Sequence, residues 1–78
     1  MIPLYGFLEG DTIGLLVLAE ETDSMRDLAE KLQQAARVRV PHTPRVKVLF
    51  QGCPLDPATT VAQTSLGALD RFDVVRDG

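Results

Sequence analysis

The stretch SMRDLAEKLQQAAR, residues 24–37, decides how the rest of the chain is arranged. Apolar side chains recur in it every three or four residues, the spacing of one helical face, at Met25, Leu28, Ala29, Leu32 and Ala36. Ser24 is a suitable N-cap, and Asp27 at the third helical position makes a weaker form of the capping box. The remaining positions are assigned to the polar face: Arg26, Asp27, Glu30, Lys31, Gln33 and Gln34. We therefore predict one amphipathic helix over residues 24–37.

Two apolar segments precede this helix. Residues 2–8 and 12–19 predict two strands, joined by the turn Glu9-Gly10-Asp11, in which glycine can adopt a positive φ. The second segment is almost continuously apolar, which is typical of a strand that the fold covers well. The two segments together predict an N-terminal β-hairpin.

Shorter segments follow the helix. Two prolines make residues 38–44 a connector, and VKVLF at residues 46–50 predicts a third strand with strong β-formers. After the turn Gln51-Gly52, residues 53–55 can add only a short edge piece, because proline cannot donate to a ladder. Residues 61–67 are expected to be irregular or to form one short helical turn, and residues 72–75 predict the last strand.

The predicted order is β-β-α-β-β-β, an α+β arrangement in which two hairpins flank one helix. A mixed sheet should wrap around that helix, with the first and last strands parallel and side by side in its middle. This arrangement is the β-grasp, or ubiquitin-like, fold. We expect residues 1–78 to form a single domain, because a chain of 78 residues has room for one core only.

The composition, with 45% hydrophobic and 24% charged residues, is that of an ordinary globular domain. No apolar run approaches the roughly 20 residues needed to span a bilayer, and we see no secretory signal. Cys53 is the single cysteine, so no internal disulfide can form, which fits a reducing compartment. We expect a cytoplasmic protein without membrane contact.

Basic residues are concentrated in one stretch. Arg37, Arg39, Arg45 and Lys47 follow one another with no intervening acid, whereas the remaining chain holds all 11 acidic residues. The stretch lacks interleaved aromatic residues, and the chain carries a net charge of −3, so nucleic acid is not expected to bind. Two alternatives remain: a solvated face, or a docking surface for an acidic protein partner, since arginine is enriched at interfaces.

No residue pattern predicts catalysis, a cofactor or a metal site. His42, the single histidine, lies between two prolines and is expected to be solvent-exposed. Cys53 is expected to be a small, partly buried hydrophobe, because no neighbouring base is available to activate it. Glu9 and Asp11 in the hairpin turn are expected to be solvated acids. The sequence thus indicates a protein that binds a partner and has no catalytic site of its own.

Two resemblances accompany these patterns. VKVLFQGCPL at residues 46–55, followed by FDVV at 72–75, resembles the second half of ubiquitin-like domains. Most of the chain is similar to the small B (gamma) subunit of the toluene monooxygenase hydroxylase family. That similarity rests on Pro3, EGD at residues 9–11, the apolar run at 15–18, DSM at 23–25, LAEK at 28–31 and SLGALDRFDVV at 65–75.

The second resemblance implies an accessory subunit of a bacterial multicomponent diiron monooxygenase that oxidises aromatic or alkene hydrocarbons. Its partner would be the large hydroxylase subunit, which would hold the metal. Part of the contact is assigned to Arg37, Arg39, Arg45 and Lys47.

Two other functions stay open. One is a free-standing ubiquitin-like adaptor, similar to the small proteins of type VII secretion. The other is a modifier or sulfur carrier, which is disfavoured because these proteins end in Gly-Gly, whereas this sequence ends in Arg76-Asp77-Gly78.

Overall fold

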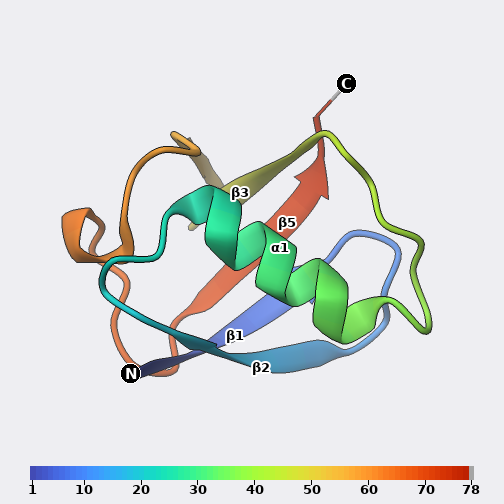
Figure 1. Ribbon diagram of the computed structural model, residues 1–78, viewed down its shortest axis with the longest axis horizontal. Helices are drawn as coiled ribbons and strands as arrows, with labels where there is room; N and C mark the ends of the chain where they lie inside the picture. Colours follow the sequence, from blue (N-terminus) through green and yellow to red (C-terminus); the bar gives the residue numbers. More distant parts are fainter. Residues whose placement is uncertain (78) are drawn as a thin grey trace.

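The computed structural model describes residues 1–77 and contains one sheet with one helix across it (Figure 1). The elements follow the predicted order: β1 (Ile2–Leu8), β2 (Gly14–Ala19), α1 (Met25–Ala36), β3 (Val46–Phe50), β4 (Cys53–Leu55), the 3-10 turn η1 (Val61–Gln63) and β5 (Arg71–Arg76). Their order in the sheet is β2-β1-β5-β3-β4. β1 and β5 are parallel at its centre, as the β-grasp prediction requires.

The helix begins as its sequence predicts. The side-chain oxygen of Ser24 accepts a hydrogen bond from the backbone N–H of Asp27 at 3.1 Å, and the Asp27 carboxylate accepts one from the N–H of Ser24 at 3.0 Å. This reciprocal capping box satisfies two of the N–H groups that a helix start leaves without partners. α1 therefore starts at Met25, within one residue of the prediction.

The core lies between α1 and the inner face of the sheet. Leu28 and Leu32 of the helix are fully buried against sheet residues that include Leu4, Phe72 and Val74. Gly6 in β1 permits the close approach, because a Cβ there would lie 2.9 Å from both Leu32 Cδ1 and Phe72 Cζ. The predicted apolar face of the helix is thus confirmed as the centre of the core.

Gln33 corrects one assignment of the sequence analysis. It was placed on the polar face of the helix, but it is buried. Its amide nitrogen donates to the carbonyl of Thr43 at 3.0 Å, and its oxygen accepts from the N–H of Thr43 at 2.7 Å. This pair of hydrogen bonds holds the connector between α1 and β3 against the helix, so the polar side chain is satisfied inside the fold.

Two further expectations are wrong. Cys53 is exposed in β4 and is not partly buried, because β4 is an edge strand of three residues. The second strand starts at Gly14, not at residue 12, and the fold covers only one of its faces. No helix among residues 1–77 is long and apolar enough to cross a membrane.

Candidate protein-binding surfaces

Arg39, one of the predicted basic contact residues, forms an ion pair inside the protein. Its Nε and Nη2 atoms donate to both oxygens of Asp11, at distances from 2.9 to 3.2 Å. The Asp11 side chain is only 2% exposed, which corrects the expectation of a solvated turn acid. These hydrogen bonds hold the pKa of the Asp11 carboxyl below its usual value and raise the pKa of the Arg39 guanidinium. Arg39 therefore joins the β1–β2 turn to the segment after α1.

His42 is half-exposed, as predicted, and has a partner on the helix. Its Nε2 lies 3.0 Å from Oε2 of Glu30. This contact lowers the pKa of the Glu30 carboxyl. The contact therefore links the connector after α1 to the helix.

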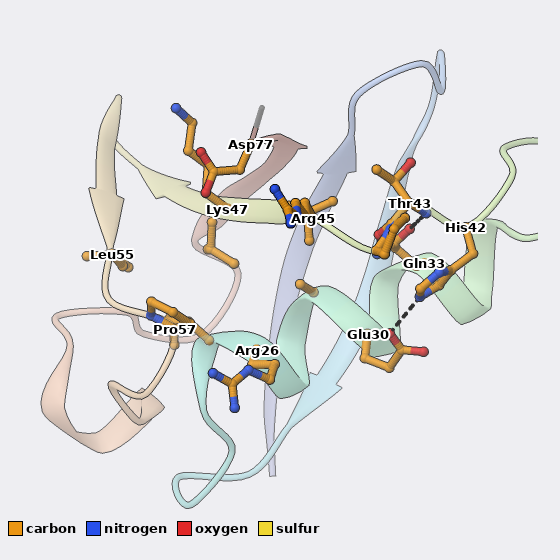
Figure 2. Close-up of a pocket in the computed structure, with 15 residues that line it drawn as sticks. Arg26, Glu30, Gln33, His42, Thr43, Arg45, Lys47, Leu55, Pro57 and Asp77 are labelled. Atoms are coloured by element: carbon orange, nitrogen blue, oxygen red, sulfur yellow. Dashed lines mark hydrogen bonds and ion pairs between the residues drawn. The ribbon is translucent and has the colours of Figure 1, made fainter.

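Arg45 and Lys47 lie on a groove between α1 and β3, which we call the α1–β3 groove (Figure 2). Its volume is about 290 Å³, and its cationic lining residues are Arg26 from the first turn of the helix and Arg45 and Lys47 from the other wall. The ion pairs formed among residues 1–77 include none of these three cations. Arg37, the remaining predicted contact, caps the end of α1 outside this groove.

The outer face of the β1–β2 hairpin carries apolar side chains that no other segment of residues 1–77 covers. Tyr5 is 43% exposed, Leu16 is 55% exposed and Leu18 is 51% exposed. Tyr5 stands directly opposite Leu16 in the register, and Pro3 stands opposite Leu18. Exposed Leu69 adjoins them, because its N–H donates to the Pro3 carbonyl at 2.6 Å. We call these five residues the outer sheet patch.

A charged border lies beside this patch. The guanidinium of Arg71 in β5 is 4.0 Å from the centre of the Phe7 ring, and its Nε donates to Asp73 at 3.0 Å. A cation placed over an aromatic face in this way is held by the ring quadrupole. An apolar centre bounded by a polar rim is the usual anatomy of a protein–protein contact.

The sequence analysis missed this patch, although a signal was available. Alternate residues of a strand point to opposite faces, and β2 is apolar at both sets of positions. That pattern was interpreted as a covered strand. Because β2 is an edge strand with α1 on one face only, Val17 and Ala19 enter the core, while Leu16 and Leu18 face outward.

The part of the chain that the structure describes holds no group of three or more His, Cys, Asp or Glu side chains placed to bind a metal ion. The two surface features that stand out are the α1–β3 groove and the outer sheet patch.

The fold places the chain in the class of ubiquitin-like β-grasp domains. A ubiquitin from Caldiarchaeum subterraneum superimposes with a TM-score of 0.80 at 11% identity, covering 99% of this chain and 94% of that one. A chain from a structure described as molecular mimicry of SUMO in DNA repair gives 0.73 at 24% identity, covering 95% and 89%. At these identities the likeness concerns the fold alone.

The sequence profile of the family described as toluene-4-monooxygenase system protein B (TmoB) matches residues 1–75, so the chain belongs to this family. A chain of the toluene 4-monooxygenase HD complex with 4-bromobenzoate has a TM-score of 0.89 at 25% identity, covering 97% of this chain and 98% of that one. This chain is accordingly an accessory subunit of a monooxygenase complex and not its catalytic subunit. A search of curated proteins finds no match.

Proposed function

We propose that this chain docks on the large, diiron-containing hydroxylase subunit of a cytoplasmic bacterial monooxygenase that oxidises aromatic or alkene hydrocarbons, and that the outer sheet patch is the centre of that contact. Membership of the TmoB family over residues 1–75 supports a role inside such an assembly. The similar chain of the toluene 4-monooxygenase complex, matched almost end to end, supports it further.

The outer sheet patch is the single observation that carries the docking surface. Tyr5, Leu16 and Leu18 form a contiguous apolar area on a chain of 78 residues. Removing apolar surface from water stabilises a complex by about 25 cal/mol per Å². Aromatic residues are also enriched at the centres of interfaces. The patch therefore has the composition of an interface core.

The basic residues would make an electrostatic contact of their own, apart from the outer sheet patch. Arg45 and Lys47 in the α1–β3 groove, with Arg37 at the end of the helix, are exposed and can face acids of the partner. Arg39 would act mainly through Asp11, by holding the hairpin turn in place. Such exposed charges chiefly affect the association rate and its salt dependence.

The accessory role would be exerted through mass action. A partner that binds only the folded state stabilises it by an amount that grows with the partner concentration. The docked chain would in this way stabilise the hydroxylase subunit and be stabilised by it, without contributing a catalytic group.

The test is co-purification of a tagged chain with the large subunit, using the double variant Leu16→Asp and Leu18→Asp. We expect the wild-type chain to recover an iron-containing subunit, and the double variant to lose it, because two carboxylates would be buried without partners. Val38→Asp is the matched control, since Val38 is an exposed apolar residue in the turn after α1. Full recovery by the double variant would refute the patch as the docking surface.

A further inference from the structure

Leu69 has a backbone conformation that its residue type rarely adopts. Its φ is 67°, in the left-handed region that is uncommon for a bulky side chain. The turn around it spans residues 67–70, and the N–H of Asp70 donates to the carbonyl of Gly67 at 3.0 Å. A type II turn requires a positive φ at its third residue, which is the position of Leu69. Local rules therefore favour glycine or asparagine where this chain has leucine.

Hydrogen bonds fix this turn beside the start of β1 (Figure 1). The N–H of Leu69 donates to the carbonyl of Pro3 at 2.6 Å. The N–H of Tyr5 donates to the carbonyl of Asp70 at 2.9 Å, and the Asp70 carboxylate accepts from the N–H of Gly67 at 2.8 Å. A strained residue persists where its surroundings determine the backbone in this way. The fold thus holds Leu69 in an unfavourable conformation on a fixed backbone.

The Leu69 side chain does not offset this strain by packing inside the protein. It is 58% exposed, whereas Leu66, three residues earlier, is buried in the core. Gln51, the other non-glycine residue with a positive φ among residues 1–77, is polar and suits its exposed place in the turn between β3 and β4. A residue that breaks a local rule without a compensating contact in its own fold is expected at a functional site. Leu69 is therefore suited to a contact outside this chain.

We propose that Leu69 anchors the contact with the large hydroxylase subunit, and that its side chain inserts into an apolar pocket of that subunit. This contact rests on the proposed function, because it presupposes that subunit and the outer sheet patch, which Leu69 joins at Pro3. A side chain on a fixed backbone loses little conformational freedom when it is bound. The leucine thus lowers the stability of the free chain and raises its affinity for the partner.

Replacing Leu69 by asparagine should change stability and affinity in opposite directions. Asparagine adopts a positive φ more readily than leucine, so Leu69→Asn should raise the thermal unfolding midpoint of the isolated chain by about 2–6 °C. Its affinity for the purified large subunit should fall by about tenfold or more, because the apolar side chain is no longer buried there. A residue with a merely structural role would not move the two measurements in opposite directions.

Two matched variants separate the effect of the side chain from that of the backbone. Gln51→Asn puts asparagine at a φ of 53°, keeps an amide at the surface, and should raise the midpoint while changing the affinity much less. Leu69→Met keeps an apolar side chain on the strained backbone, so it should retain most of the affinity without a rise in stability. A loss of stability in Leu69→Asn, or an affinity equal to that of the wild-type chain, would overturn the proposal.

A second measurement identifies what the side chain contacts. A photo-reactive leucine analogue at position 69 is cross-linked within the assembled complex, and the attached peptide is identified by mass spectrometry. We expect a peptide of the large subunit with apolar residues at the linked position. A cross-link to a polar segment, or to a second copy of this chain, would overturn the proposal.

The anchor and the docking face fail in different ways. Loss of binding in the Leu16→Asp and Leu18→Asp variant, together with wild-type affinity of Leu69→Asn, would retain the docking face and refute the anchor. The opposite pattern would retain the anchor and refute the patch as the centre of the contact. A wild-type chain that binds no hydroxylase subunit would refute both.

Discussion

The inner and outer faces of the β1–β2 hairpin are built from the same kinds of side chain and end in different surroundings. Val17 is buried, whereas its neighbours Leu16 and Leu18 are more than half exposed. The difference arises because α1 covers one face of the sheet and no element formed by residues 1–77 covers the other. Apolar character thus predicts burial only when another element is present to cover the side chain, and the uncovered face is where we propose that a partner docks.

The largest contrast between the two faces should come from truncating one leucine on each side. Leu32→Ala, on the helix that covers the inner face, should lower the free energy of unfolding by about 2–5 kcal/mol, because it leaves a cavity in the core. Leu18→Ala, on the outer face, should change it by only about 0.5 kcal/mol or less. Urea unfolding of the isolated chain measures both, and equal losses would show that the outer face is not free.

Replacing one glycine by alanine on each face of the hairpin should give the second-largest difference in stability. Gly6→Ala places a Cβ 2.9 Å from Leu32 and Phe72, both fixed in the core, and should cost about 1–3 kcal/mol of stability. Gly14→Ala places a Cβ 2.5 Å from the Phe7 ring on the outer side, which can swing toward solvent. We expect a smaller loss for Gly14→Ala in thermal unfolding, with a new environment for Phe7 in NMR spectra. Identical losses would contradict this difference in freedom.

The covering helix can be weakened without touching either face. Ser24→Ala removes the side chain that accepts from the N–H of Asp27 and should cost about 1 kcal/mol. Urea unfolding measures the loss, and Ser65→Ala, at an exposed position outside the helix, is the matched control. A loss no greater than that of the control would mean that packing alone holds the helix start.

The smallest change in stability should come from protonating the acids of two ion pairs, Asp11 with Arg39 and Asp23 with Lys31. Hydrogen bonds from Arg39 lower the pKa of Asp11, and the backbone N–H of Glu20, followed by Lys31, lowers that of Asp23. A carboxyl whose pKa is lower in the folded state stabilises the fold above its unfolded pKa, about 3.9 for Asp. That stabilisation is lost as the pH falls through the folded pKa.

Unfolding midpoints measured between pH 7 and pH 3 test this expectation. The wild-type chain should lose stability below about pH 5, and Asp11→Asn should show a shallower decline because one of the titrating groups is absent. An equally steep decline in the variant would place the acid sensitivity elsewhere in the chain.

Local patterns were sufficient for the elements and their order. The capping box at Ser24 and the apolar spacing of the helix involve residues a few positions apart, so their physics is visible in the sequence. The same holds for the turn at Gly10, where φ is 94°. The β-grasp followed because two hairpins and one amphipathic helix have few ways to share a core.

The surfaces were predicted less well. Arg39 was grouped with Arg37, Arg45 and Lys47 by sequence position. In the structure it forms an ion pair with Asp11, which is 28 residues away. Lys31 lies one helical turn after Asp27 in the sequence, but its Nζ donates to the Asp23 carboxylate, at 2.6 Å. In each case the partner was decided by contacts between distant segments, which no local pattern contains.

The sequence by itself determined the order of the elements, the start of the helix and membership of a family, because these depend on local spacing and on residue identity. Only the tertiary structure decided which apolar residues stay uncovered and which cations remain unpaired. Both depend on what lies opposite each side chain in space. The outer sheet patch and the α1–β3 groove are therefore visible only once the helix is in place on one face of the sheet.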